Sequence, residues 1–443
     1  MAQNNSIKKI ASASFLGAFL EWYDFFLYGT ASAVVLNKLF FPSSDPMVGT
    51  LAAFGSLASG YLIRPIGGIV FGHFGDRLGR KKVLAITMIL MGGVTFLIGL
   101  LPTYESIGIW APTLLIFLRL IQGFALGGEY GGASLLLIEH APREKRGFWG
   151  GVLQAATPLG ALAASGIFAI VASLEESVFL SIGWRIPFLI SIVLTIVGLF
   201  VRFRIEETPA FKEIKETGTE ERFPLLELFR SYSKNIWIAL GARLSEGVSF
   251  NIFNVFVITY VTTHLGLPNS TALFGVSISS GIAALFSPLF GMLSDKFGRK
   301  KVYLFGAIWF IAFAYPFFAL LDTKIGLVIY IAIAMGYVLS TTPMFSIQSV
   351  FFSEMFGTRV RYTGLSFVYQ LAGVLAGLTP LISTSLLLYN NGNPLYVIVF
   401  MIGIGLITMI STMLTKETYK LDVSEIEAEM QVVESKQLGE KHS

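Results

Sequence analysis

The sequence predicts an all-α membrane protein whose twelve transmembrane helices form two pseudo-symmetric bundles of six. Three observations support this fold class. Of the 443 residues, 54% are hydrophobic and only 14% are charged, with a mean hydropathy of +0.70. Long apolar runs recur along the chain, and one short basic loop occurs twice, about half the chain length apart. This composition lies outside the usual range of water-soluble domains.

The predicted spans follow from the apolar runs taken in order. About 20 apolar residues cross the ~30 Å of bilayer hydrocarbon, and polar or charged loops separate the runs. The first run contains Glu21 and Asp24 and is too long for a secretory signal peptide, so we expect a retained first helix. The spans are residues 10–36, 49–72, 83–102, 111–138, 148–172, 184–203, 234–263, 270–292, 302–321, 326–352, 363–388 and 394–415.

A repeated loop indicates that the two groups of six spans are related. Residues 72–82 read GHFGDRLGRKK and residues 291–301 read GMLSDKFGRKK, and each copy stands between two apolar runs. A second match relates residues 139–147 to residues 354–364 at nearly the same offset. Two such matches favour a duplicated helix bundle with the same tight turns in both copies.

We therefore predict four segments. These are an N-terminal six-helix bundle at 1–203, a cytoplasmic linker at 204–233, a C-terminal six-helix bundle at 234–415 and a cytoplasmic tail at 416–443. The mixed charges of the linker predict short surface helices in a solvated connector. The tail is only weakly amphipathic, so we expect a flexible segment, with a partner-binding helix as the alternative.

The basic residues sort to one side of the predicted membrane. Both termini and the loops after even-numbered spans carry 26 of the 32 Lys and Arg. The opposite side holds only Lys38, Arg185 and Lys324. By the positive-inside rule we expect a multi-pass plasma-membrane protein with both termini in the cytoplasm.

Composition also excludes several classes of site. The chain has no cysteine, and its four histidines are scattered without ligand spacing, which rules out disulfides and thiolate chemistry. We expect no cofactor, metal or nucleic-acid partner, and a monomer in the lipid bilayer. A membrane enzyme would need a nucleophile and base, or metal ligands, at membrane depth. The histidines lie in loops, at span edges or in the tail, and disfavour that class.

Six ionisable residues inside the spans are the first candidates for function. One Asp or Arg at the centre of a membrane helix costs ~2.5–3.5 kcal/mol on insertion scales, so such residues usually face a partner or a water-filled cavity. The six are Glu21, Asp24, Arg119, Glu129, Arg243 and Glu246.

Glu21 and Asp24 are three residues apart and share one helix face. Two carboxylates in a low dielectric are not easily both ionised, so we expect one of them to bind a proton. That is the requirement of a proton-coupled carrier. In a second interpretation, Arg119 holds Asp24 ionised and releases it when substrate arrives. In a third interpretation, Asp24 and Arg119 form a permanent structural ion pair.

The span arginines are candidates for binding an anion. Arg119 and Arg243 each offer a fork of donors suited to a carboxylate, and one from each half would hold an anion between the bundles. In the equally weighted alternative, Arg243 only neutralises Glu246. Arg64 precedes Pro65 toward the cytoplasmic end of its span, where its side chain could reach the interface, so we favour gating or packing for it.

A glycine-rich run in the fourth span predicts close helix contact. Gly123, Gly127 and Gly131 recur every four residues, as in tightly packed membrane helices, and they frame Glu129. Polar and aromatic residues elsewhere in the spans are further candidates to line a binding cavity, with the amides favoured because they need partners in hydrocarbon. They are Tyr23, Gln154, Asn251, Asn254, Gln348 and Tyr369.

These motifs together resemble the major facilitator superfamily, and within it the metabolite:proton symporters that include shikimate, 2-oxoglutarate, citrate and proline/betaine permeases. The resemblance covers residues 10–415. It is carried by the doubled loop and by five shorter motifs, which are EWYDFFLYG at 21–29, RPIGG at 64–68, RLIQG at 119–123, GGEYGG at 127–132 and RVRYTG at 359–364.

The resemblance implies roles for several of these residues. It implies a cytoplasmic latch of Asp76, Arg80 and Glu139, with Arg77 in the same loop, that breaks during alternating access. Asp24 and Arg119 would match the acid–arginine pair used for proton coupling in related symporters. The second latch would have Lys296 in place of an arginine, which keeps the charge but loses the fork, and its members are Asp295, Arg299 and Glu354.

The sequence thus predicts a proton symporter that imports a small organic acid through a site between the bundles. A zwitterionic osmolyte such as proline or betaine is the closest alternative, because an arginine suits its carboxylate and an aromatic ring suits its cation. A sugar or drug carrier of the same superfamily is a further alternative, disfavoured by the arginines inside the membrane.

Overall fold

The structure is a computed structural model of the whole chain. It describes the backbone of residues 2–43, 45–78, 80–127, 137–138, 141–203, 229, 232–356, 361–417 and 419. Within these ranges, side chains are described except at residues 2–10, 13, 72–78, 80–82, 84, 201–203 and 361–362. The regular secondary structure of the described part is helical throughout.

The first six spans are built from consecutive helices, several of them interrupted by π-helical turns. They are α1 (Ala2–Ala31) with turn η1 (Ser32–Leu36) and α2 (Asn37–Leu39); α3 (Pro46–Leu62) with α4 (Arg64–Leu78); α5 (Arg80–Leu100); α7 (Trp110–Leu126), preceded by the short α6 (Tyr104–Ile107); η2 (Arg143–Lys145) with α9 (Arg146–Gln154) and α10 (Ala156–Ala172); and α11 (Glu176–Val178) with η3 (Phe179–Gly183) and α12 (Arg185–Phe203).

The last six spans repeat this plan. They are α15 (Ser233–Asn251) with η4 (Ile252–Phe256), α16 (Val257–Thr259) and η5 (Tyr260–His264); α17 (Asn269–Phe297); α18 (Arg299–Leu321); α19 (Gly326–Gly336) with η6 (Tyr337–Thr341) and α20 (Thr342–Ser353); α21 (Arg361–Tyr389); and α22 (Leu395–Leu414).

These helices have the length and surface of membrane spans. In the described part, nine helices are long and apolar enough to cross a bilayer, and Ala85–Leu100 and Trp110–Leu126 are shorter apolar helices. With α1 they account for the twelve predicted spans. Large apolar side chains such as Ile69, Ile196 and Leu285 are exposed on their outer faces, as expected where lipid replaces water. The helix α1 begins before residue 10 because no Gly or Pro interrupts its start.

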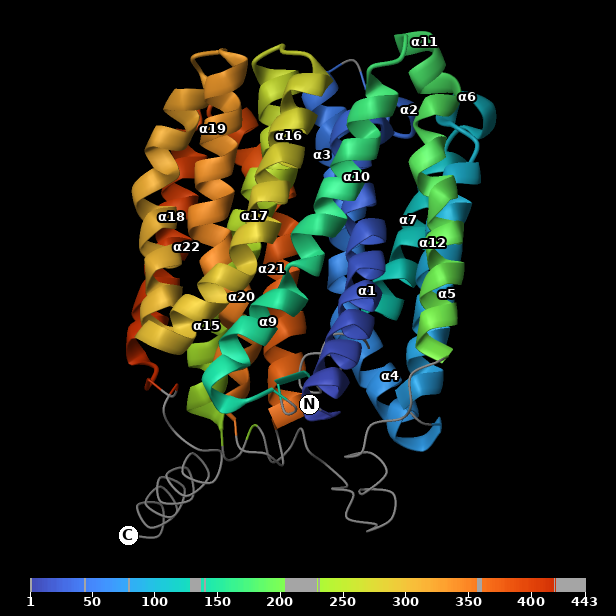
Figure 1. Cartoon of the computed structure of the whole chain (residues 1–443). Helices are drawn as coiled ribbons and strands as arrows, with labels where there is room; N and C mark the ends of the chain where they lie inside the picture. Colours follow the sequence, from blue (N-terminus) through green and yellow to red (C-terminus); the bar gives the residue numbers. More distant parts are fainter. Residues whose placement is uncertain are drawn as a thin grey trace.

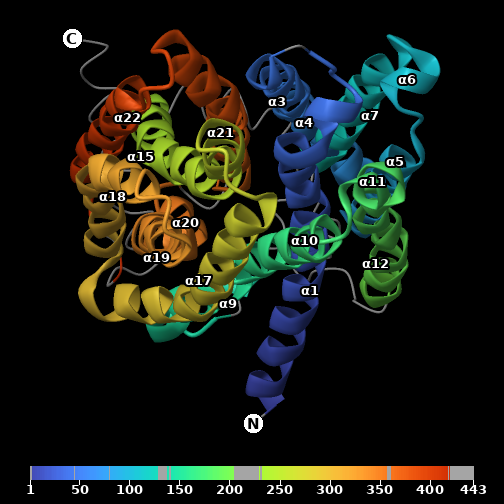
Figure 2. The ribbon, with the colours of Figure 1, turned by 90° about the horizontal axis from the view of Figure 1, so that it is seen from above.

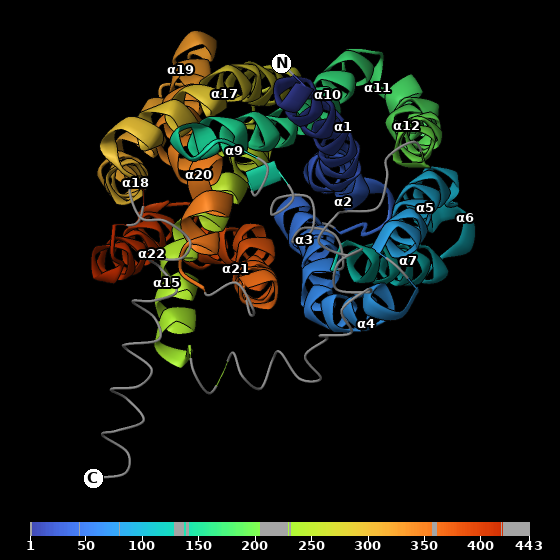
Figure 3. The ribbon, with the colours of Figure 1, turned by 60° about the horizontal axis from the view of Figure 1, so that its bottom comes forward.

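The two halves of the chain lie side by side. Figure 2 shows α1 to α7 and α10 to α12 on one side and α15 to α22 on the other. The α10 helix packs on α17, and α21 packs on α3 and α4. The α1 helix begins and α22 ends at the lower end of Figure 1, which we call the terminal face. There α9 reaches across to α17 and α20, as Figure 3 shows.

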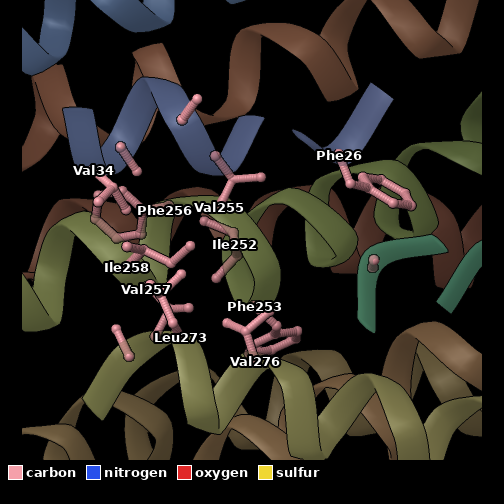
Figure 4. Close-up of a cluster of buried hydrophobic side chains, with 14 of the residues drawn as sticks. Phe26, Val34, Ile252, Phe253, Val255, Phe256, Val257, Ile258, Leu273 and Val276 are labelled. Carbon is pink, nitrogen blue, oxygen red and sulfur yellow. The ribbon is translucent and has the colours of Figure 1, made fainter. Parts of the chain in front are cut away.

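An apolar seam fills much of the contact between the halves. The ring of Phe26 in α1 stacks on Phe250 in α15 with 4.6 Å between centroids, and Trp22 meets Phe345 edge-on at 6.2 Å. Around η4, a cluster of buried side chains continues this seam into the C-terminal half, from Phe26 and Val34 to Leu273 and Val276 (Figure 4). The seam is dry packing, so polar groups next to it must find their partners within the protein.

Glycines allow the backbones to approach at the predicted positions. A Cβ added at Gly123 would overlap the carbonyl of Gly60 in α3, and one at Gly127 would overlap the carbonyl of Arg64. The interpretation of these two glycines as sites of close helix contact is confirmed. Gly131 lies outside the described residues. Since α3, α4 and α7 meet without intervening side chains, the residues beside these glycines are held in fixed positions.

We expect Gly123→Ala to lower the thermal unfolding temperature of the purified protein, because overpacking a close contact typically costs ~1–3 kcal/mol. Gly93→Ala is the matched control, since a Cβ at Gly93 meets nothing within 4 Å. Unfolding of both variants would be followed by intrinsic fluorescence in the same detergent. Equal unfolding temperatures would show that the α3–α7 contact is not tight.

Candidate functional site

Three arginines from both halves gather near the centre of the molecule. Arg64 opens α4, Arg119 lies in the middle of α7 and Arg243 lies in the middle of α15, and they are 5%, 0% and 5% exposed. Arg64 is within electrostatic range of both Arg119 and Arg243. Three buried positive charges this close repel one another, so this centre requires anionic or aromatic partners.

Arg119 is held by a short polar chain inside the N-terminal half. Its Nη1 donates to Oε1 of Gln122, and Nε2 of Gln122 donates to Oγ1 of Thr95 at 2.8 Å. The guanidinium lies over the rings of Tyr28 and Phe25, 4.5 and 5.2 Å from their centroids. Among the described residues, its buried Nε and Nη2 have no hydrogen-bond acceptor. These groups are available to an anion that enters the site.

Arg64 is buried and packs inside the protein, whereas its place in the sequence also allowed its side chain to reach the membrane interface. The second span breaks at Ile63, and Arg64 begins the new helix. The guanidinium lies 4.1 Å from the ring centroid of Tyr61 and 4.5 Å from that of Phe25. Its buried Nε and Nη2 also have no acceptor. A gating role for Arg64 stays a prediction.

Arg243 differs because its charge is balanced locally. Its Nη1 lies 2.7 Å from Oε2 of Glu246 and donates to Oε1 of Gln348 at 2.8 Å. Its guanidinium also covers the ring of Tyr369 at 3.8 Å. The ion pair foreseen in the alternative interpretation of Arg243 is therefore present. Whether Arg243, Glu246, Gln348 and Tyr369 contact substrate stays a prediction.

Side chains from the two halves meet directly beside this centre. Tyr61 of α3 lies close to Asn251 of α15. Nearer the terminal face, Nε2 of Gln154 donates to Oγ of Ser349 at 3.0 Å. Both predicted amides, Asn251 and Gln154, thus lie on the boundary between the halves.

The acidic pair of α1 lies on the side of that helix facing α5 and α12. Glu21 and Asp24 line a cavity of about 10 Å³, together with Met88, Met91 and Thr195. A space of this size is at the lower limit for one water molecule. Asp24 is 5% exposed. Within the described residues, Arg119 forms no ion pair with Asp24, so the predicted acid–arginine contact is not present in this structure.

Two other predicted cavity residues are used in packing. The hydroxyl of Tyr23 donates to the carbonyl of Pro187 at 2.9 Å, inside the N-terminal half. Asn254 donates to the carbonyl of Phe250 at 3.1 Å and accepts from Ser280 at 3.3 Å, inside the C-terminal half. None of these three bonds involves an arginine.

The second copy of the predicted latch closes the terminal face. The carboxylate of Asp295 accepts from the backbone N–H groups of Gly147 and Phe148 at 2.8 and 2.9 Å, which caps α9 of the other half. Arg299 donates to Asp295 at 2.7 Å, and its Nε lies 3.9 Å from Oε1 of Glu354. The halves are thereby joined at this face.

The remaining predicted residues lie outside the described part. This holds for the side chains of Asp76, Arg77 and Arg80 and for Glu129 and Glu139. In the described part there is no group of three or more His, Cys, Asp or Glu placed to hold a metal.

Sequence analysis missed several residues of this centre. Phe25 and Tyr61 contact the arginines, and the only sequence signal for Tyr61 was that it lies three residues before Arg64 in the same predicted span. Gln122 was recognised only as part of a motif.

A contact at the terminal face was also missed. Glu417 in the predicted tail accepts from the backbone N–H groups of Arg299 and Lys300 at 2.9 and 3.1 Å, a contact that no local pattern indicated.

Comparison with known proteins places this geometry among transporters. Residues 9–222 match the family model "Sugar (and other) transporter", and residues 239–438 match "Major Facilitator Superfamily". The shikimate transporter of Escherichia coli (strain K12) is 39% identical over 418 residues, covering 93% of this chain and 95% of that protein. The proline/betaine transporter of the same strain is 35% identical, covering 91% of this chain and 83% of that protein.

Solved structures show the same fold. The proton:xylose symporter XylE bound to 6-bromo-6-deoxy-D-glucose matches with a TM-score of 0.75 at 19% identity, over 96% of this chain and 99% of that one. An inward-open conformation of XylE from E. coli matches with a TM-score of 0.68, also at 19% identity, over 95% of this chain and 99% of that one. The predicted fold of twelve helices in two bundles is confirmed.

We expect Asp295→Ala to open the terminal face. The substitution removes the two charge-assisted hydrogen bonds that join the halves, from Gly147 and Phe148, each worth ~1.5–3 kcal/mol, so the open population should rise at least about a hundredfold. The chain has no cysteine, so the modification rate of a single buried Ser349→Cys reports this opening without background.

Asp322→Ala is the control for that measurement. Asp322 accepts from Tyr260 at 2.7 Å at the opposite end of α18, and its loss should leave labelling at position 349 unchanged. Equal labelling rates with and without Asp295 would show that this carboxylate does not hold the face closed.

Proposed function

The chain belongs to the major facilitator superfamily and is a multi-pass membrane transporter, not an enzyme, and on that premise we propose that it imports a small organic acid by proton-coupled symport. The two halves would expose the central site alternately to either side of the membrane. We place the chain in the plasma membrane with the terminal face on the cytoplasmic side, because most Lys and Arg lie on that side. The working unit would be a monomer.

The proposal that the substrate is an organic acid rests on the arginine N–H groups that lack hydrogen-bond acceptors in the described part of the chain. In the described part of the chain, Arg64 and Arg119 together present four buried N–H-bearing nitrogens with no acceptor. Buried charged donors are strongly destabilising without a partner, and a carboxylate supplies two acceptor oxygens in matching geometry. Shikimate, the substrate named for the most identical relative described above, is a cyclic carboxylate.

Glu21 and Asp24 would supply the proton coupling. Both line one small cavity behind α1, on the other side of that helix from the seam with the C-terminal half. In a low-dielectric site two neighbouring carboxylates favour sharing a proton over carrying two charges. Movement of α1 would change access to this cavity, so protonation and substrate binding would favour the same conformation.

Alternating access would break one set of contacts between the halves and keep another. At the terminal face the bonds from Gly147 and Phe148 to Asp295 would open. Toward the opposite face, the hydroxyls of Ser165 and Ser277 lie 2.9 Å apart and join α10 to α17. These two helices touch along their length, so they would act as the line about which the halves rock.

Uptake of a zwitterionic osmolyte is the second candidate function. The observation that favours it is the 35% identity to the proline/betaine transporter. Proline and betaine share the carboxylate of an organic acid but add a positive charge. A panel of carboxylates, zwitterions and sugars therefore separates the two proposals and the sugar carrier.

We expect Asp24→Asn to abolish the accumulation of labelled shikimate that an inward proton gradient drives in proteoliposomes, since the amide cannot take up a proton. Exchange of internal for external shikimate should persist, because it needs no net proton movement. Asp45→Asn is the control, since Asp45 caps the start of α3 outside the site. Uptake that survives both Asp24→Asn and collapse of the proton gradient would refute the coupling.

A further inference from the structure

We infer that Arg64 and Arg119, both in the N-terminal half, anchor the substrate carboxylate, and that this site selects net-anionic acids over zwitterions of the same shape. The inference rests on the proposed transport of an organic acid and adds which residues bind it and which charge class it must have. It also assigns Arg64 to substrate binding instead of gating. The pair Arg64 and Arg119 takes the place of the predicted pair Arg119 and Arg243 as the residues that hold the anion.

The two side chains converge on one place. Both guanidinium groups lie over the ring of Phe25, at 4.5 and 5.2 Å from its centroid, and both are within electrostatic range of Tyr61. Each keeps a buried Nε and Nη2 without an acceptor. Two guanidinium groups next to one ring bring together the kind of donors that a carboxylate takes from arginine.

Arg243 is less suited to be the anchor. It already has a carboxylate in Glu246 at 2.7 Å and an amide oxygen in Gln348 at 2.8 Å. A substrate would have to displace Glu246 to bind there. The uncompensated positive charge of the centre therefore lies with Arg64 and Arg119, and one substrate carboxylate leaves the surroundings still positive.

The aromatic rings of the centre are already covered by arginine. Arg64 covers Phe25 and Tyr61, Arg119 covers Tyr28, and Arg243 covers Tyr369. A quaternary or secondary ammonium needs such a ring face or a free carboxylate. Here it would meet guanidinium groups instead, so an added positive charge weakens binding.

Gly60 determines where the Arg119 guanidinium lies. A Cβ at Gly60 would stand 2.6 Å from Nε and 3.1 Å from Cδ of Arg119. A methyl group there must push the guanidinium away from its place over Phe25. Gly55, in the same helix, has open space around its Cβ position and provides the matched control.

The test measures binding to the full chain in lipid nanodiscs by calorimetry, with matched pairs of probes. Betaine is compared with 3,3-dimethylbutyrate, and proline with cyclopentanecarboxylate, because each pair differs mainly in whether a positively charged nitrogen is present. Shikimate is the fifth probe. We expect each carboxylate to bind at least about tenfold more tightly than its zwitterionic counterpart. Equal or tighter binding of the zwitterions, or no binding of any carboxylate, would overturn the inference.

Substitutions test which residues bind the substrate carboxylate. Arg64→Gln and Gly60→Ala should each weaken shikimate binding at least about tenfold, Arg64→Lys should weaken it less, and Gly55→Ala should leave it unchanged. Removal of an unpaired buried charge should also raise the unfolding temperature of ligand-free Arg64→Gln, which loss of a structural contact would not do. Unchanged shikimate binding in Arg64→Gln overturns the assignment.

The outcomes separate the inference from the proposed function. Proton-coupled uptake of an acid that Arg64→Gln leaves intact, with unchanged KM, would refute the anchor and keep the symport. Anion-selective binding that depends on Arg64, in a protein whose uptake carries no proton, would keep the anchor and refute the coupling.

Discussion

The burial of three arginines where the two halves meet is the constraint on which the rest of the structure depends. Charged groups are very unfavourable in a bilayer, and those that are retained usually bind or move something. One of the three, Arg243, is neutralised by Glu246 and bonded to Gln348. The other two rely on aromatic faces and on one amide, so the centre is incomplete without an anion.

The surrounding helices are built to hold those charges in place. Gly60 and Gly123 allow α3 and α7 to touch, and the break after Ile63 turns Arg64 toward Phe25. Gln122 on α7 itself and Thr95 from a third helix, α5, then fix Arg119. These are short-range contacts between rigid elements, which keep a polar centre ordered when little water is present to rearrange around it.

The sequence predicted the fold well because membrane spans follow from local properties. Apolar length and charge placement each depend on neighbouring residues alone, and the predicted fold of twelve helices in two bundles agrees with the structure. The family resemblance implied a latch that includes Asp295 and Arg299, and these two side chains do contact each other, while their gating role stays a prediction. The site was harder to predict, because the pairing of side chains depends on helix rotation and tilt. Glu21 and Asp24 share a face as expected, yet that face points to α5 and α12, and Arg119 pairs with Gln122 instead.

The central claim is that an organic anion and a proton cross together through this chain. The measurement that addresses it most closely is the internal pH of proteoliposomes, read with a trapped dye, when shikimate, proline, betaine or xylose is added outside without a pre-formed gradient. The account predicts acidification on addition of shikimate and none with the other three. Entry of labelled shikimate with no change in internal pH would contradict it, and acidification only with proline or betaine would assign the chain to osmolyte uptake instead.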